Sequence, residues 1–312
     1  MKELTQITMN SSSSPVCVLD ASSYVGFWIL KGLLTKGYTV HAAIQHTNNI
    51  GETNIEKKIK EMEKENEKLV VYGVDVFDYQ SILIALKGCC ALFCCFDSAD
   101  GYDDVKVVDM EVRGVINVVE ACAQTECVEK IVFTSSLTAA IWKDNISTQV
   151  DVDERSWSNQ DFCRKFKLWY ALAKTESEQA AWALAMDRKV KMVSINAGVV
   201  LGPNVTQLNP RSTISYLKGA AEMYENGVLA IVEVSFLVDV HIRALEDGTT
   251  CGRYFCFNEI VNTPQQALQL AQTLTPLISF PAERYEYEEG SEVHAERLRA
   301  KKLNKLVEGT AA

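Results

Sequence analysis

The sequence predicts an α/β fold in which a doubly wound parallel sheet carries a smaller C-terminal lobe. Apolar runs of strand length alternate with helical patterns through the first two thirds of the 312 residues, an order typical of β-α-β units. The chain is 47% hydrophobic, so it is rich enough in apolar residues and long enough to bury one large core and a small attached lobe. A single enzyme-sized unit follows from these two observations.

The elements follow one another in a regular order. The strand candidates are short apolar runs at 16–19, 39–44, 69–72, 91–95, 130–134 and 191–196. The helix candidates lie at 25–35, in a Lys/Glu-rich segment where Ile55, Ile59 and Met62 recur at helical spacing, and at 81–87, 105–123 and 169–185. Strands that are buried on both faces have continuous apolar runs of this kind. The order is that of a Rossmann-type sheet.

The pattern loosens after Gly202-Pro203, and this change divides the chain. We expect a flexible N-terminus at 1–14, which is polar and Ser-rich, and a dinucleotide-binding Rossmann domain at 15–202. Residues 203–312 are expected to form a substrate lobe and C-terminal tail, interleaved with the first part as one structural unit. Within them we predict a strand at 253–257, a helix at 264–273 and a basic surface helix at 297–305.

The charge and composition of the chain argue against nucleic acid, membranes and metal ions as binding partners. The net charge is −10, from 31 basic and 41 acidic residues, and this repels nucleic acid and anionic membrane surfaces. No apolar run reaches the roughly 18 residues of a membrane span, and the start lacks a signal-peptide core. We therefore expect a cytoplasmic monomer or homodimer. Without a Cys-x-x-Cys pair and with only 4 His, no metal site is expected.

A dinucleotide-binding sheet needs a tight turn between its first strand and first helix, where backbone amides approach the pyrophosphate. That turn occupies residues 20–26 here, and only the last of its three glycine positions is glycine. By their place in the turn, the predicted cofactor-binding residues are Asp20, Ser22, Ser23, Tyr24, Val25 and Gly26.

Tyr170 and Lys174 form a Y-x-x-x-K pair on a predicted helix, so both side chains lie on one face. An adjacent ammonium favours the phenolate of a tyrosine and brings its pKa toward the working range of an acid or base. Ser136 ends a buried strand 34 residues before Tyr170, where its hydroxyl can polarise a carbonyl oxygen. Ser135 is the neighbouring alternative. The competing interpretation is that both serines only terminate the strand and that Tyr170 is an interfacial aromatic.

With these motifs in place, residues 15 to about 273 resemble the plant cinnamoyl-CoA reductase and dihydroflavonol reductase group of extended short-chain dehydrogenases/reductases, most of all its divergent cinnamoyl-CoA reductase-like branch. The resemblance implies that Ser136, Tyr170 and Lys174 are catalytic and that the cofactor is NADP, or else NAD. It also implies a small-molecule carbonyl substrate. The further cofactor-binding positions that it implies are Gln45, Asp75, Val76, Ala197 and Val199, together with Tyr170 and Lys174.

Four cofactor contacts depart from the pattern of that group. Asp20 and Ser23 stand where it usually has glycine, and Gln45 stands where it has an arginine that reads the 2′-phosphate. Phe96 replaces a small residue beside the cofactor ribose; it either fills cofactor space or closes a pocket from the side. In addition, residues 171–173 lack the Cys-Tyr-Gly of true cinnamoyl-CoA reductases, so thioester reduction is not implied.

Two functions are therefore compatible with the sequence. The first is an NAD(P)-dependent carbonyl reductase acting on a phenylpropanoid-type aldehyde, ketone or thioester, as the resemblance and the Ser136, Tyr170 and Lys174 trio indicate. The alternative is a non-catalytic binding or regulatory protein that keeps the fold with a degraded cofactor site, since a fold alone does not fix an activity.

Overall fold

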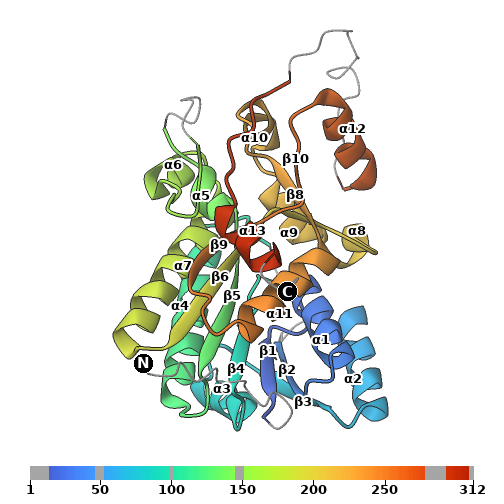
Figure 1. Ribbon diagram of the computed structural model, residues 1–312, viewed down its shortest axis with the longest axis vertical. Helices are drawn as coiled ribbons and strands as arrows, with labels where there is room; N and C mark the ends of the chain where they lie inside the picture. The colour runs from blue at the N-terminus through green and yellow to red at the C-terminus, as the bar shows by residue number, and fades with distance from the viewer. Residues whose placement is uncertain (1–13, 46–52, 99–100, 145–150, 278–292, 309–312) are drawn as a thin grey trace, which may run out of the picture.

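The computed structural model describes residues 14–45, 53–98, 101–144, 151–277 and 293–308. Its centre is a seven-stranded sheet in the order β3-β2-β1-β4-β5-β6-β9 (Figure 1). All neighbouring strands of this sheet run parallel. The predicted α/β fold with a Rossmann-type sheet is confirmed. The expected flexible segment 1–14 lies outside the described residues except for Ser14.

The strands are β1 Val16–Leu19, β2 Val40–Gln45, β3 Leu69–Val74, β4 Ala91–Cys94, β5 Lys130–Ser136, β6 Lys191–Ala197, β7 Val199–Leu201, β8 Ala230–Glu233, β9 Gly252–Cys256 and β10 Glu259–Ile260. The helices are α1 Tyr24–Thr35, α2 Asn54–Glu65, α3 Tyr79–Leu86, α4 Lys106–Gln124, α5 Thr138–Ile141, α6 Gln160–Lys165, α7 Trp169–Arg188, α8 Val205–Leu208, α9 Pro210–Tyr216, α10 Ala220–Glu225, α11 Val234–Glu246, α12 Pro264–Thr273 and α13 Lys301–Glu308.

The strand order reverses between β1 and β4. β1 pairs with β2 on one side and with β4 on the other, so that Val18 lies between Ala42 and Phe93. The connections leave the sheet in opposite directions at this point, which opens a crevice at the carboxyl ends of the two strands. Ligands of open α/β sheets bind in such a crevice.

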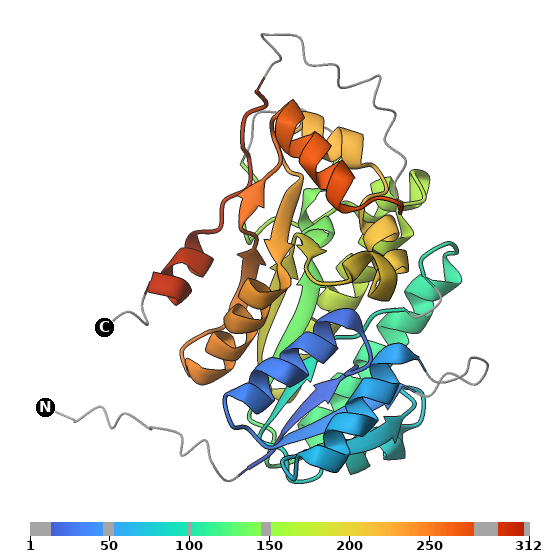
Figure 2. The same ribbon diagram turned by 90° about the vertical axis from the view of Figure 1, so that its right-hand side faces the viewer.

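Helices cover both faces of the main sheet (Figure 2). One buried cluster joins the sheet to α3, α4 and α7, and another joins it to α1, α2, α11 and α13. Helix α4 packs along α7 over much of its length, which explains why α4 carries buried residues such as Val115 and Val118. This packing brings the face of α7 that carries Lys174 against α4.

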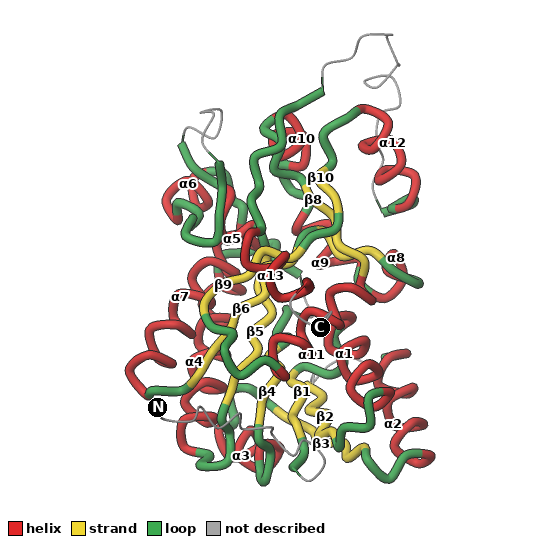
Figure 3. The backbone as a smooth tube through the Cα atoms, viewed as in Figure 1, coloured by secondary structure: helices red, strands yellow, loops and turns green. Residues whose placement is uncertain are grey.

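A smaller lobe stands above the carboxyl edge of the sheet. It contains the three-stranded sheet β10-β8-β7 with α10 and α12 (Figure 3). The apolar cluster between the lobe and the main sheet includes Trp142, Tyr216 and Met223. The last strand of the main sheet, β9, comes from the chain after residue 202, so this part of the chain contributes to both sheets.

The predicted strands agree with the structure to within two residues, but the predicted surface helix at 297–305 is wrong in position and in exposure. The helix is α13, Lys301–Glu308, and its Leu303 and Leu306 are buried. The residues before it are held outside a helix because Leu298 bridges to Val152 and the amide of Arg299 donates to the Val152 carbonyl. No helix among the described residues is long and apolar enough to cross a membrane.

Candidate active site

The turn between β1 and α1 is organised by Ser23, the N-cap of α1. Its Oγ accepts from the amide of Gly26 at 3.1 Å and donates to the carbonyl of Asp20 at 2.8 Å. Gly26 cannot carry a side chain, since a Cβ there would lie 2.0 Å from that same Asp20 carbonyl oxygen. Ser23 therefore stabilises the turn from within, and Gly26 is required by the close approach of the backbone.

Asp20 is directed back into this turn. Its Oδ1 accepts from the Ser22 amide at 2.9 Å and from the Ser22 hydroxyl. Burial raises the pKa of Asp20 to about 6, although the bonds from Ser22 oppose this shift. The carboxylate that the sequence places near the pyrophosphate position is thus close to neutral in mildly acidic solution.

Three donors at this corner point to an anionic ligand. In the described part of the chain, no acceptor bonds the backbone amides of Tyr24 and Val25, which belong to the first turn of α1 and face a pocket. Gln45, at the end of β2, has a buried Nε2 without a partner. Free amides at a helix N-terminus bind phosphate well. These groups fit the phosphates and ribose of a dinucleotide.

The segment after β4 passes through the same corner. Cys95, Phe96 and Asp97 line the pocket. The Phe96 ring belongs to the cluster on the α3 and α4 face and lies against Gly114, where an added Cβ would be 3.3 Å from the ring. Phe96 therefore directs most of its ring into the core between sheet and α4.

The two serines at the end of β5 have different partners. Ser135 donates to the buried Glu178 at 2.7 Å, so its hydroxyl is already engaged. The Ser136 hydroxyl accepts from the amide and hydroxyl of Thr138, and hydrogen bonding by Ser136 acts to lower the pKa of Tyr170. Of the two serines, Ser135 lines the pocket together with Tyr170. Both therefore stay candidates, and the catalytic role of Ser136 stays a prediction.

Helix α7 holds Tyr170 and Lys174 one turn apart. The Lys174 Nζ lies 5.4 Å from the centre of the Tyr170 ring. It donates to the carbonyl of Phe96 at 3.0 Å and forms ion pairs with Glu111 at 3.1 Å and Asp97 at 3.5 Å. Lys174 is 4% exposed. Its ammonium is thus enclosed by one carbonyl and two carboxylates.

The pKa values of the pair follow from this enclosure. Burial opposes the charged form of Lys174, but Glu111 and Asp97 outweigh that effect and raise its pKa. Desolvation raises the pKa of Tyr170 above its usual range, while Lys174 lowers it by less. Lys174 acts on Tyr170 in the direction expected from the sequence, but burial has the larger effect.

Two residues of this cluster were missed by sequence reasoning. Glu111 is 2% exposed although it lies in a helix with many charges. The Tyr102 Oη lies 2.5 Å from the Asp97 Oδ1 and also within hydrogen-bonding distance of Glu111, so its single proton can be donated to either carboxylate. Its ring meets the ring of Tyr170 edge-on with centroids 4.8 Å apart. In the sequence, Glu111 resembles any charged residue on the surface of a helix. Only the packing of α4 on α7 shows that it is a partner of Lys174.

The pocket at this corner is nearly closed. It is lined by the turn, the ends of β4, β5 and β6, Tyr170, Lys174 and α9, and encloses about 60 Å³. Small-molecule sites usually measure roughly 300–1,000 Å³. Ser212 of α9 donates to Asp97, and both residues line the pocket. The donors fit the phosphates of a dinucleotide, but the enclosed space is smaller than such a ligand needs.

The remaining predicted cofactor residues lie around this corner. Ala197 ends β6, and Val199 begins β7; both line the pocket. Val76 is buried after β3, and its carbonyl accepts from Asn117 at 2.9 Å. Asp75 is exposed and uses its Oδ1 to accept from the Phe77 amide. The roles assigned to these residues stay predictions.

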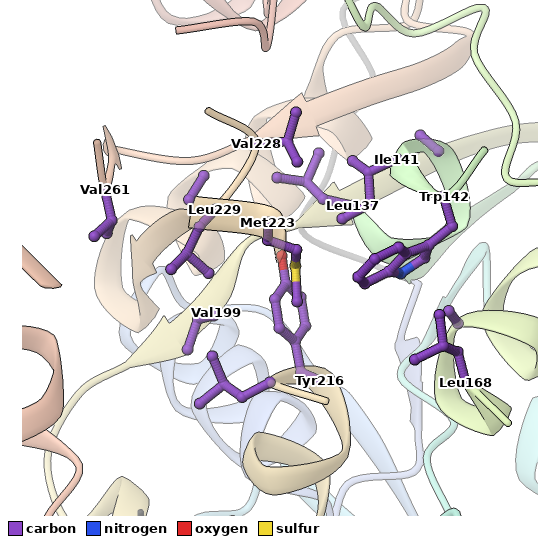
Figure 4. Close-up of a cluster of buried hydrophobic side chains, with 14 of the residues drawn as sticks. Leu137, Ile141, Trp142, Leu168, Val199, Tyr216, Met223, Val228, Leu229 and Val261 are labelled. Atoms are coloured by element: carbon purple, nitrogen blue, oxygen red, sulfur yellow. The ribbon is translucent and has the colours of Figure 1, made fainter. Parts of the chain in front are cut away.

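Next to the pocket lies the apolar cluster of the lobe. Figure 4 shows the Tyr216 ring rising among Val199, Met223 and Leu229. Tyr216 is 4% exposed, and its hydroxyl has no partner among the described residues. Because Tyr216 also lines the pocket, the cluster forms an apolar wall beside Tyr170.

Comparison with known proteins agrees with this geometry. Residues 16–239 match the NAD dependent epimerase/dehydratase family. The chain belongs to this family. Among its relatives, cinnamoyl-CoA reductase 1 of Petunia hybrida is 34% identical over 254 residues, which are 80% of this chain and 74% of that protein. Dihydroflavonol 4-reductase of Zea mays is 31% identical and covers 79% of this chain and 70% of its own length.

Solved structures of reductases share the fold. Vestitone reductase from alfalfa (Medicago sativa L.) has a TM-score of 0.68 at 24% identity, with 94% of this chain and 92% of that chain covered. A yeast methylglyoxal/isovaleraldehyde reductase, solved with NADPH, has a TM-score of 0.69 at 18% identity and covers 94% and 93%. The resemblance to the cinnamoyl-CoA and dihydroflavonol reductases is confirmed, with relatives of these two kinds at 29–34% identity.

Proposed function

We propose that this protein is an NAD(P)-dependent carbonyl reductase of the cinnamoyl-CoA reductase-like type. The observation that carries the proposal is the meeting of Tyr170 and Lys174 at one pocket corner, beside the end of β5 that carries Ser135 and Ser136 and beside the first amides of α1. The relatives named as reductases support it. Its substrate is a small carbonyl compound, such as a phenylpropanoid-type aldehyde, ketone or thioester.

In this function each member of the trio has one task. The Ser136 hydroxyl donates to the substrate carbonyl and polarises it, and the Tyr170 Oη gives its proton to the oxygen as negative charge develops there. The Lys174 ammonium stabilises the phenolate that Tyr170 then becomes and orients the ribose. The cofactor, when bound, supplies the hydride.

The wider assignments belong to the same proposal. NADP, or else NAD, would bind at residues 20–26, Gln45, Asp75 and Val76, and the substrate would bind between Tyr170 and the lobe after residue 202. The apolar wall around Tyr216 supports an apolar substrate body. The net charge of −10 supports a protein that avoids nucleic acid. The proposal also includes a cytoplasmic location and a monomeric or homodimeric state.

A turnover assay tests the proposal. We expect NADPH to be consumed with at least one of cinnamoyl-CoA, a dihydroflavonol, vestitone or methylglyoxal. Tyr170→Phe should lower kcat by about 10²-fold or more, since it removes the proton donor. Tyr79→Phe is the matched control, because it removes a hydroxyl that has no partner on the distant α3. Undiminished turnover by Tyr170→Phe would overturn the catalytic assignment.

The non-catalytic alternative is favoured by one observation, the nearly closed pocket with Lys174 already paired. It predicts that neither NADPH nor NADH changes the intrinsic Trp fluorescence at micromolar concentration. The control is a chain with Asp20→Gly and Ser23→Gly, which restores the glycine pattern of the group. Binding by the unchanged chain would count against this alternative.

A further inference from the structure

The partners of Lys174 form a buried acidic cluster: Glu111 from α4, Asp97 and Tyr102 from the segment between β4 and α4, and Ser177 from α7. Ser177 donates to Glu111 at 3.0 Å, and the Tyr102 hydroxyl lies between the two carboxylates, where its single proton can be donated to either. Each oxygen of Glu111 therefore has a donor within reach. A carboxylate that is 2% exposed and has a donor beside each oxygen holds a fixed geometry.

The groups around Tyr170 carry more negative than positive charge, and this disfavours its phenolate. One ammonium, Lys174, faces the two carboxylates of Glu111 and Asp97 at 3.1 and 3.5 Å. From the turn before α1, Asp20 adds a further acidic group close to Asp97. The other titratable groups that face the cluster are the phenols of Tyr102 and Tyr216 and the thiols of Cys94 and Cys95 at the end of β4.

We propose that Glu111 is a positioning residue that acts through Lys174: together with Asp97 it balances the ammonium and keeps Tyr170 in the phenol form, which sets the site to donate a proton in the reducing direction. This inference rests on the proposed function. Reduction needs Tyr170 to begin as the phenol, whereas oxidation of an alcohol needs the phenolate to accept the proton. An ammonium whose charge is offset by two carboxylates stabilises the phenolate less, so it favours the phenol form and the reducing direction.

The proton and the electrons balance in this scheme. The O–H bond of Tyr170 breaks as the proton moves to the substrate oxygen. A bound reduced nicotinamide would supply the hydride: its own C–H bond would break and it would be oxidised, while the carbonyl carbon would gain the new C–H bond and be reduced. The phenolate that remains lies beside Lys174, and solvent returns its proton after the product leaves. Glu111 exchanges no proton with the substrate, so it is not a catalytic residue.

The experiment is an NMR titration of the full chain with ¹³C-labelled tyrosine rings, in which the Tyr170 signal is identified by its loss in Tyr170→Phe. In the unchanged chain the midpoint should lie above ~10, the value of a free tyrosine. Glu111→Gln should lower it by about 1 pH unit or more, because one nearby negative charge is lost. Glu111→Asp should restore part of the shift.

Glu120→Gln is the matched control, since Glu120 lies on the same helix but pairs with Arg188 at the surface. It should leave the midpoint unchanged. Equal midpoints in the unchanged chain and in Glu111→Gln would overturn the proposal. If Glu111→Gln does not fold, Asp97→Asn takes its place, and a midpoint below ~10 in the unchanged chain overturns the proposal without any variant.

An activity measurement separates this inference from the proposed function. With a carbonyl compound that is reduced, the alkaline limb of kcat against pH should move to lower pH in Glu111→Gln, in step with the NMR midpoint. If no compound is reduced, the proposed function fails, while the titration still decides whether Glu111 controls Tyr170.

Discussion

At the scale of single residues, burial controls the charges that meet at the pocket. Asp20 shows this most directly, because its carboxylate is 7% exposed and faces the N-terminus of α1. Burial raises its pKa from 3.8 to about 6. Since the folded value lies above the unfolded one, Asp20 contributes stability that is fully present below about pH 4 and is lost as the pH rises through about 6.

This sign gives a prediction for Asp20→Asn. The variant keeps an oxygen for the bonds from Ser22 but cannot ionise. The difference in free energy of unfolding between the variant and the unchanged chain should therefore grow in favour of the variant by about 1 kcal/mol between pH 5 and pH 8. Urea unfolding at both pH values measures this difference. Asp161→Asn, at a carboxylate with 95% side-chain exposure, serves as control and should show no such growth. An equal advantage of Asp20→Asn at both pH values would contradict the prediction.

Asp20 should also make cofactor affinity depend on pH. An ionised carboxylate beside the pyrophosphate position repels it, so the Kd for NADPH should rise as the pH goes from 5 to 8. In Asp20→Asn the rise should be smaller. Fluorescence titration at each pH measures both proteins, and parallel curves would show that Asp20 does not face the cofactor.

At the scale of elements, the joint between β1 and α1 depends on Gly26, the one position of the turn's glycine pattern that is glycine in this chain. An added Cβ would lie 2.0 Å from the backbone carbonyl of Asp20 and 2.8 Å from the Ser23 Oγ. We expect Gly26→Ala to lower the free energy of unfolding by about 2 kcal/mol or more, because the contact is with backbone. Gly248→Ala, where nothing lies within 4 Å, should change it by less than about 0.5 kcal/mol. A similar loss in both variants would refute this account.

The same scale shows what a sequence can predict. The strands and the pair Tyr170 and Lys174 were accessible because apolar runs and a spacing of four residues are local signals. Glu111 and Tyr102 were not, since their contacts with Lys174 depend on how α4 docks on α7. The departure at Phe96 was visible in the sequence, but the direction of its ring is set by the space above Gly114.

At the scale of the whole molecule, the lobe and the main sheet meet across the pocket. Asp97 follows β4 of the sheet, and Ser212 belongs to α9 beside the lobe. Their hydrogen bond joins two residues that line the pocket. Asp97 also holds Lys174. A ligand that enters between sheet and lobe therefore competes with two contacts of Asp97. One is its hydrogen bond with Ser212, and the other is its ion pair with the Lys174 ammonium.

The last prediction concerns the first of these contacts. Ser212→Ala removes this hydrogen bond, and since a hydrogen bond to a charged group contributes roughly 1.5–3 kcal/mol, NADPH should bind about tenfold more tightly or better. Ser215→Ala makes the same change elsewhere on α9 and should leave the Kd unchanged. Hydrogen exchange of α9 should increase when NADPH binds to the unchanged chain, because binding separates α9 from Asp97. Weaker binding by Ser212→Ala, with constant exchange in α9, would mean that the cofactor enters without opening this contact.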